Sequence, residues 1–181
     1  MTATPDQVLI RLARVEDASA IADVNIRSWR EAHRTLLSPA FLAGLEQNRQ
    51  RRTAYFEQAV AAGEPGIRVA ERGGRVVGFC CFGASRDQDV PPGSGELMAI
   101  YLLQEAWGQG IGSRLWHTAR QGLETAGYRT ASAWVLDGNV RATRFYRNAG
   151  FHADASSQRT FEENGEPLPL TRFTLSLAQP A

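Results

Sequence analysis

The feature that most constrains the fold is a glycine-rich turn between an apolar segment and an amphipathic segment. Residues 96–103 read Glu-Leu-Met-Ala-Ile-Tyr-Leu-Leu, a mostly apolar run that predicts a buried strand. Glycines then recur at alternate positions: Gly108, Gly110 and Gly112. A helix that ends at Gly127 is indicated by apolar residues at every fourth position: Ile111, Leu115, Ala119 and Leu123. The chain therefore contains a strand, a glycine turn and a helix in direct succession.

This turn is suited to bind a phosphate group. The first N–H groups of a helix lack intrahelical partners, and the positive end of the helix dipole stabilises an anion placed there. Glycines let the anion approach the backbone closely. A nucleoside-triphosphate loop does not fit, because Ser113 and Arg114 stand where a lysine is required, and a dinucleotide fingerprint would need its third glycine one position later. A plain strand-to-helix connection remains the alternative.

Composition bounds the class of protein. The 181 residues, 43% of them hydrophobic, are enough for one compact domain over 1–181. The 20 basic and 19 acidic residues nearly cancel, which argues against nucleic acid or an acidic membrane surface as a partner. Cys80 and Cys81 are neighbours in a predicted strand, where their side chains point to opposite faces and do not bridge. No apolar run reaches the ~20 residues of a membrane helix and residues 1–7 lack a secretion signal, so we expect a cytoplasmic protein.

The remaining pattern predicts a mixed α/β order of elements. Strands are expected at 8–13, 67–71, 76–82, 96–103, 130–136, 151–157 and 170–177. Helices are expected at 17–33, 41–45, 50–62, 111–126 and 139–149. A Gly-Gly turn joins the second and third strands, and a polar connection over 162–166 joins the last two.

A second motif follows the glycine turn. It reads N-x-x-A-x-x-F-Y-x-x-x-G-F and consists of Asn139, Ala142, Phe145, Tyr146, Gly150 and Phe151. With the turn from Trp107 to Gly112, it resembles the GCN5-related N-acetyltransferase (GNAT) family, in a bacterial subgroup whose acceptor is unassigned. Two residues depart from the family pattern. Trp107 stands where the family turn begins with Gln or Arg, and Gln104 replaces a common proline.

The resemblance implies a GNAT-like fold and a cofactor site. The fold would be a mixed, mostly antiparallel central sheet of about seven strands flanked by helices and splayed where acetyl-CoA inserts. Main-chain groups of Ile100, Tyr101 and Leu102 would pair with the pantetheine arm. Asn139 would cap its helix and bond the cofactor. The pyrophosphate would contact Trp107, Gly108, Gln109, Gly110, Ile111, Gly112 and Ser113.

The implied reaction moves an acetyl group from acetyl-CoA to a primary amine by direct attack in a ternary complex. Tyr146 is the candidate general acid that protonates the leaving thiolate, against the alternative of a packed core tyrosine. Glu96 is the candidate general base, acting through a water, against the alternative of a solvated carboxylate at a strand end. The histidines show no metal-ligand spacing, so no metal is expected.

The acceptor stays open between a small-molecule amine and a peptide amine. Trp29, His33 and Tyr55 lie in the N-terminal helices, which the resemblance places at the wall of the acceptor site, although core packing is the role expected of Trp29. The main alternative function is a non-catalytic acyl-CoA-binding sensor or assembly module. A related acyl donor, such as succinyl-CoA, is a third. A homodimer, formed through sheet edges or the C-terminal strands, is an expectation that rests on the resemblance alone.

Overall fold

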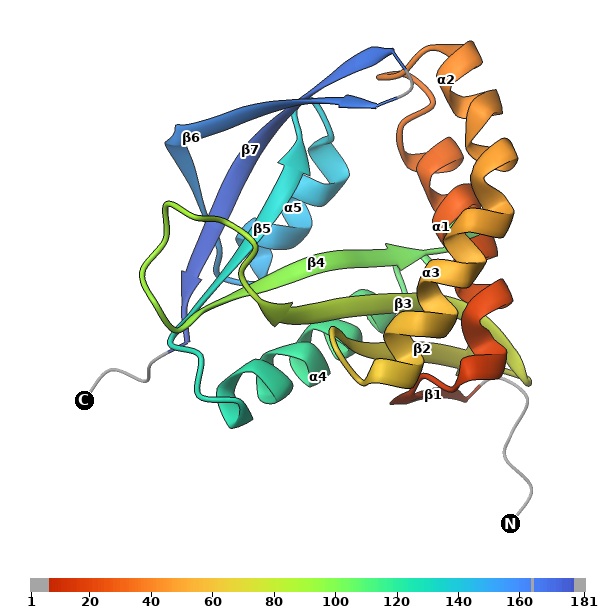
Figure 1. Cartoon of the computed structure of the whole chain (residues 1–181), viewed down its shortest axis with the longest axis horizontal. Coiled ribbons are helices and arrows are strands. Elements are labelled where there is room, and N and C mark those ends of the chain that lie inside the picture. The colour runs from red at the N-terminus through yellow and green to blue at the C-terminus, as the bar shows by residue number, and fades with distance from the viewer. Residues whose placement is uncertain (1–6, 164, 178–181) are drawn as a thin grey trace.

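A seven-stranded sheet forms the centre of the computed structural model, which describes residues 7–163 and 165–177 (Figure 1). Its strand order is β1-β2-β3-β4-β5-β7-β6, and every neighbouring pair is antiparallel except β4 and β5. The strands are β1 (Val8–Leu12), β2 (Gly66–Arg72), β3 (Arg75–Ala84), β4 (Ser94–Leu102), β5 (Thr130–Leu136), β6 (His152–Glu163) and β7 (Glu166–Ser176). The expected mixed, mostly antiparallel sheet is confirmed.

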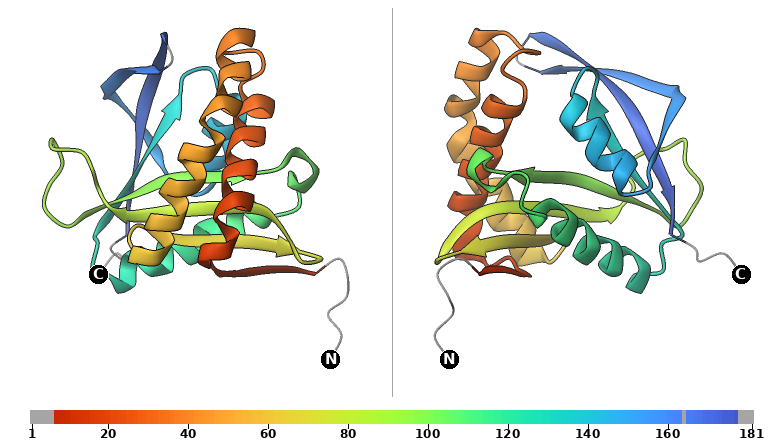
Figure 2. Two further views of the ribbon diagram at one scale, coloured as in Figure 1. Left: turned by 45° about the vertical axis from the view of Figure 1, so that its right-hand side comes forward. Right: turned by 180° about the vertical axis from the view of Figure 1, so that it is seen from behind.

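Helices cover both faces of this sheet. Three lie on one face, with α4 and α5 on the other, as the view from behind shows (Figure 2). They are α1 (Ala18–Ala32), α2 (Pro39–Gly44), α3 (Arg49–Ala62), α4 (Ile111–Thr125) and α5 (Val140–Asn148). Single turns of 3₁₀-helix are η1 (Val15–Asp17), η2 (Leu45–Asn48) and η3 (Gln104–Ala106).

The C-terminal hairpin differs from the sequence prediction. The expected strands 151–157 and 170–177 are confirmed, but β6 continues to Glu163 and β7 already begins at Glu166. The polar connection over 162–166 was wrong for this reason, although Asn164 lies outside the described residues. Charged side chains do not interrupt β6 because it is an edge strand whose residues are mostly exposed to solvent, while β7 pairs with it over 152–154 and 158–163.

The splay between β4 and β5 positions the functional site. The two strands pair only from Ser94 opposite Thr130 to Glu96 opposite Ser132, and then separate. A bulge at Met98 interrupts the pairing of β4 with β3 just beyond this point, and bulges of this kind bend a strand. Within the described part of the chain, the edge of β4 that faces away from β3 has no strand partner from Leu97 to its end at Leu102.

Two apolar clusters hold the splayed halves in place. The larger one fills the space between the sheet and its helices and includes Phe79, Leu115 and Phe151. The smaller one joins α1 and α2 to the far ends of β5 and β7 through the buried side chains of Ile26, Phe41, Leu45, Leu136 and Leu168. Because the smaller cluster bridges the open side of the splay, the gap between β4 and β5 is a fixed part of the fold.

Candidate active site

The glycine turn adopts a backbone that only glycine adopts at low cost. Gly108 and Gly110 have φ values of 72° and 73°, in the left-handed region, and Gly110 is the N-cap of α4. A Cβ atom added at either glycine would meet nothing within 4 Å. The turn therefore requires these two glycines for their conformation, and the space above them is open to a ligand.

The backbone amides of the turn are available to an anion. The first amide to donate within the α4 helix is that of Arg114, 3.2 Å from the carbonyl oxygen of Gly110. Within residues 7–163 and 165–177, the amides of 108–113 donate to no recorded backbone acceptor. These N–H groups lie at the positive end of a 15-residue helix, which is the arrangement that binds phosphate.

Gly112 has a different role from the first two glycines. A Cβ there would lie 3.3 Å from Cε2 of Phe145 and 3.5 Å from Cδ1 of Leu102. The missing side chain thus lets α4 approach both α5 and the end of β4. Phe145, which belongs to the second motif, packs directly on the first motif at this point.

Along the free edge of β4, every second residue directs its backbone amide and carbonyl groups toward the gap. The amide of Leu103 donates to the carbonyl of Val77 (2.9 Å), so the antiparallel ladder also directs the polar backbone groups of Tyr101 toward β3. Those of Ile100 and Leu102 face the opening. The Leu102 carbonyl already accepts hydrogen bonds from Ser28 Oγ (2.9 Å) and from the Trp107 indole (3.0 Å). Ile100 is therefore the residue whose amide and carbonyl are presented to the gap.

Two side chains of the turn stabilise the turn itself. The Trp107 indole N–H donates to Leu102, and the guanidinium carbon of Arg141 lies 3.9 Å from the Trp107 ring centroid. Gln109 donates from Nε2 to the carbonyl of Glu105 (2.8 Å) and accepts at Oε1 from Arg72 (2.8 Å). Neither side chain is directed by a recorded contact toward the open amides, so the backbone is the ligand surface of the turn.

Tyr146 lies on α5 and is 7% exposed. Its ring contacts Phe151 and Phe173, at centroid distances of 5.3 and 5.9 Å. Burial raises the pKa of the Tyr146 hydroxyl far above its usual range, and the negative charge of Glu96 adds to the shift. The hydroxyl is therefore protonated at neutral pH and can act as a proton donor.

Glu96 is buried, at 1% exposure, so the alternative of a solvated carboxylate at a strand end is wrong. Its carboxylate accepts three hydrogen bonds from Arg86: from the backbone amide (3.0 Å), from Nε (3.2 Å) and from Nη2 (2.5 Å). The Arg86 side chain is itself 65% exposed. Sequence reasoning missed Arg86, because no pattern in this polar loop indicates that its arginine side chain folds back onto the strand that carries Glu96.

Asn139 joins two helices. Its side-chain oxygen accepts from the amide of Ala142 (3.0 Å), which confirms the predicted N-cap of α5. Its Nδ2 lies 3.2 Å from Nε2 of His33, at the end of α1. Since the oxygen is used in the cap, Nδ2 is the donor and His33 Nε2 the acceptor. Burial lowers the pKa of His33 to about 4, so the imidazole is neutral and can accept.

A buried ion network anchors the loop between β3 and β4. Asp87 accepts hydrogen bonds from the Trp134 indole (3.0 Å), from Arg159 (3.1 Å) and from Arg172 (3.3 Å). Arg172 is 6% exposed and also binds Asp89 (2.8 Å). The loop that carries Arg86 is thus fixed to the far half of the sheet, on β5, β6 and β7. No local sequence pattern indicates this network, because its members come from four separate segments of the chain.

The described residues give little support to a metal site, a cysteine nucleophile or a membrane-spanning helix. Among the described residues, no group of three His, Cys, Asp or Glu side chains is arranged to hold a metal ion. Cys80 and Cys81 are free and buried, and burial raises the pKa of Cys80 to about 12, which leaves a thiol and not a nucleophilic thiolate. None of the helices that the structure describes combines the length and apolar character needed to cross a bilayer.

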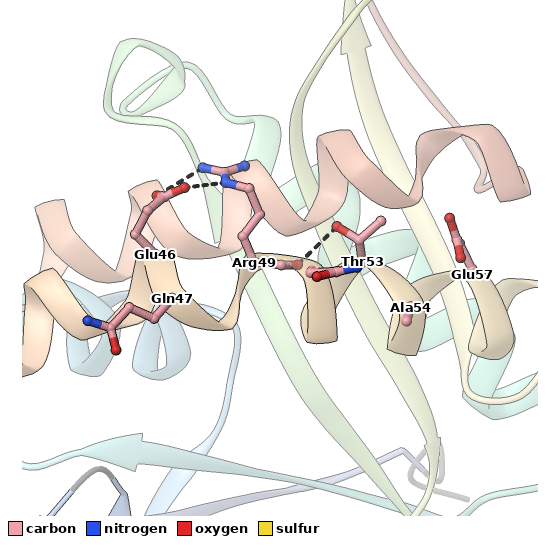
Figure 3. Close-up of a pocket in the computed structure, with 7 residues that line it drawn as sticks. Glu46, Gln47, Arg49, Thr53, Ala54 and Glu57 are labelled. Carbon is pink, nitrogen blue, oxygen red and sulfur yellow. Dashed lines mark hydrogen bonds and ion pairs between the residues drawn. The ribbon is translucent and has the colours of Figure 1, made fainter.

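Two cavities on the surface differ in their relation to this site. The larger, about 580 Å³, lies along η2 and α3 and is lined by residues such as Glu46, Thr53 and Glu57 (Figure 3). None of the predicted site residues lines it. The smaller, about 360 Å³, is bordered by Trp107 and Arg141 and therefore adjoins the glycine turn.

Comparisons with known proteins agree with this geometry. The model of the acetyltransferase (GNAT) family matches residues 27–151. The chain is 29% identical over 160 residues to YuaI, an uncharacterized N-acetyltransferase of Bacillus subtilis (strain 168), a match covering 88% of this chain and 85% of YuaI. Its fold is similar to PaiA N-acetyltransferase of Thermoplasma acidophilum, solved with coenzyme A (TM-score 0.72, 16% identity, 91% of this chain and 98% of that one). It is also similar to yncA of Salmonella typhimurium, solved with its cofactor acetyl-CoA (TM-score 0.70, 21% identity, 97% of each chain).

The family match spans more than half of the chain and contains the glycine turn, the splayed strands and the second motif. Sequence motifs, fold and relatives all indicate the same cofactor, whose pyrophosphate suits the open amides of the turn. The chain belongs to the GNAT family and is an N-acetyltransferase that uses acetyl-CoA as its acetyl donor.

Proposed function

We propose that the enzyme holds acetyl-CoA in the gap between β4 and β5 and transfers the acetyl group directly to a bound amine. The observation that carries this proposal is the end of strand pairing at Glu96 and Ser132, followed by an unpartnered β4 edge that leads to the glycine turn. The pantetheine arm would take the place of a strand beside Ile100, as peptides do when they extend a sheet. The pyrophosphate would be bound by the amides of 108–113.

Tyr146 is proposed as the general acid. The neutral amine nitrogen attacks the thioester carbonyl carbon, the carbon–sulfur bond breaks, and the leaving thiolate takes the Tyr146 proton. The nitrogen of the new amide then loses its extra proton, which returns to Tyr146 through solvent. The Tyr146 hydroxyl is protonated before the reaction, as a general acid must be, and burial keeps it in that form. The main-chain amide of Ile100, at the open edge, is a candidate donor to the carbonyl oxygen as negative charge develops on it.

Glu96 is proposed as the group that receives the ammonium proton of the acceptor through a water. In the structure both of its oxygens accept hydrogen bonds from Arg86. Arg86 is largely exposed and comes from a loop, so a small displacement of its guanidinium would free one carboxylate oxygen. Arg86 therefore becomes a positioning residue for the base in this proposal.

The acceptor is proposed to be a small-molecule or peptide amine that enters between α1, α3 and the loop of Arg86. Trp29 and His33 pack together there, with ring centroids 4.6 Å apart, and Trp29 also approaches Tyr101. Tyr55 is 53% exposed on α3. The near-neutral net charge of +1 gives no support to nucleic acid as a partner. The homodimer and the cytoplasmic location remain predictions.

Calorimetric titration with acetyl-CoA, CoA and succinyl-CoA, followed by a thiol-release assay on a panel of amines, tests the proposal. Binding of acetyl-CoA with amine-dependent thiol release is the expected result. Binding without thiol release on any amine would favour the non-catalytic acyl-CoA-binding sensor. Faster thiol release from succinyl-CoA than from acetyl-CoA would identify succinyl-CoA as the donor. Failure to bind any CoA species would overturn the assignment of the turn.

A further inference from the structure

One position of the turn, Trp107, departs from the family pattern, and an arginine from another element packs on its ring. Trp107 stands where a Gln or Arg side chain is usual, so the turn has no side-chain cation at that position. Over its ring lies the guanidinium of Arg141, 3.9 Å from the centroid. Arg141 is the second residue of α5 and therefore comes from the opposite wall of the gap.

The contact leaves the hydrogen-bonding capacity of Arg141 in place. A guanidinium over an aromatic ring uses its face, while its five N–H donors lie in its plane. Among the described residues, no carboxylate lies within 4.0 Å of Arg141, whereas other arginines such as Arg49, Arg86 and Arg172 are ion-paired. Trp107 thus holds a cation whose donors make no recorded hydrogen bond to any residue that the structure describes.

The surroundings of this pair are concave and basic. The cavity of about 360 Å³ that borders Trp107 and Arg141 is also lined by Arg30 and Arg34, at the end of α1. Its single acidic lining residue, Glu31, accepts a hydrogen bond from the Gln104 amide (3.0 Å). Three arginines and one engaged carboxylate at the end of a turn with open amides favour an anionic ligand, and planar guanidinium groups match phosphate.

We propose that Arg141, positioned by the ring of Trp107, binds a phosphate of the CoA donor and takes over the role of the side chain that the turn lacks. This inference rests on the proposed binding mode, in which the pyrophosphate lies on the turn. It assigns a binding role to Arg141 and a positioning role to Trp107, neither of which follows from the motif alone.

The test compares Arg141→Ala with Arg147→Ala, which removes the same charge from an exposed position of the same helix. Dissociation constants for acetyl-CoA are measured by calorimetry, after circular dichroism has shown that both variants are folded. We expect Arg141→Ala to weaken acetyl-CoA binding about 10-fold and Arg147→Ala to change it less than 2-fold. Trp107→Ala should weaken binding about 3-fold, because the guanidinium loses its support.

Two further donors identify the phosphate and separate this inference from the proposed function. With S-acetyl-pantetheine, which has no phosphate, wild type and Arg141→Ala should have equal kcat/KM in thiol release. The affinity for 3′-dephospho-acetyl-CoA shows which phosphate Arg141 binds. If wild type still binds this donor more tightly than Arg141→Ala does, Arg141 contacts the pyrophosphate. If the two proteins bind it equally, Arg141 contacts the 3′-phosphate. An effect of Arg141→Ala below 2-fold on acetyl-CoA, or an equal loss with S-acetyl-pantetheine, overturns the inference. Wild type that binds no CoA species overturns the proposed function instead.

Discussion

The side chains of His33 and Asn139 are 106 positions apart in sequence and meet at 3.2 Å, Nε2 to Nδ2. This hydrogen bond connects the end of α1 to the beginning of α5, across the side on which β4 and β5 separate. Asn139 is fixed from both sides, since its oxygen caps α5 and its nitrogen is held by His33. The cofactor contact that the family resemblance predicts for Asn139 therefore depends on the neutral form of a buried histidine, His33, which is 4% exposed.

Protonation of His33 should destabilise the protein at mildly acidic pH. Burial lowers the folded-state pKa to about 4, below the unfolded value of 6.5, so the unfolded state binds the proton more readily. The contribution to stability is complete above pH 6.5 and is lost as the pH falls toward 4, to a total of about 3 kcal/mol. Urea unfolding between pH 4 and 7 measures this slope.

The His33→Gln variant separates this effect from that of the carboxylates. Gln keeps a hydrogen-bonding group beside Asn139 but does not titrate. We expect its stability to fall less steeply than that of wild type between pH 6.5 and 4. Parallel curves for the two proteins would mean that His33 does not carry the pH dependence.

Tyr146→Phe should reduce kcat about 100-fold while acetyl-CoA binding stays within 2-fold of wild type, because the substitution removes the proposed proton donor and keeps the packed ring. The ring contacts with Phe151 and Phe173 are retained, so stability should change little. Steady-state thiol release and calorimetry measure the two quantities. Unchanged turnover with an unchanged pH profile would remove Tyr146 from the mechanism.

Removal of Arg86 should affect both stability and the proposed base. In Arg86→Ala the buried Glu96 carboxylate loses two of its three recorded hydrogen bonds, at a cost of about 2 kcal/mol. Glu96→Gln should cost less, because it leaves no buried charge, yet it should lower kcat. A double-mutant cycle in urea gives the coupling energy, and the pH dependence of kcat tests the base. A Glu96→Gln enzyme with wild-type kcat at every pH would assign Glu96 a structural role.

Substitution of Gly110, which has a left-handed backbone conformation, should weaken acetyl-CoA binding in addition to lowering stability. Gly110→Ala introduces strain of about 1–2 kcal/mol at φ 73°. Gly127→Ala is a matched control at the other end of α4, with φ 85° and nothing within 4 Å of an added Cβ. We expect similar losses of stability and a weaker acetyl-CoA affinity, by 10-fold or more, for Gly110→Ala only. Equal affinities would show that the turn does not bind the donor.

Asp87 and Asp89 both bind Arg172, but their environments predict different losses of stability when each is replaced by alanine. The Asp87 side chain is 2% exposed and that of Asp89 is 61% exposed. Asp87→Ala leaves the buried guanidinium of Arg172 short of a partner and should cost about 3–5 kcal/mol. Asp89→Ala should cost much less than Asp87→Ala, because water replaces an exposed carboxylate. Chemical denaturation compares the two, and equal small losses would contradict the proposed anchoring of the loop.

The sequence by itself determined the local features of this protein. The apolar run of 96–103, the alternate glycines and the every-fourth-residue pattern after them predicted a strand, a turn and a helix, and all three are confirmed. The cap at Asn139 was also predictable, because an N-cap depends on one side chain and the amides that follow it. These features were accessible because periodicity and capping are set by neighbours along the chain.

Tertiary structure alone decided which distant side chains meet. The contacts of Glu96 with Arg86, of Asn139 with His33 and of Trp107 with Arg141 join elements whose relative placement no local pattern reports. The extension of β6 into polar sequence has the same origin, since pairing with β7 satisfied its backbone. A sequence period specifies which face a residue occupies on its own element. The packing of that face against another element specifies its partner, and with it the charge, protonation and accessibility on which the chemistry depends.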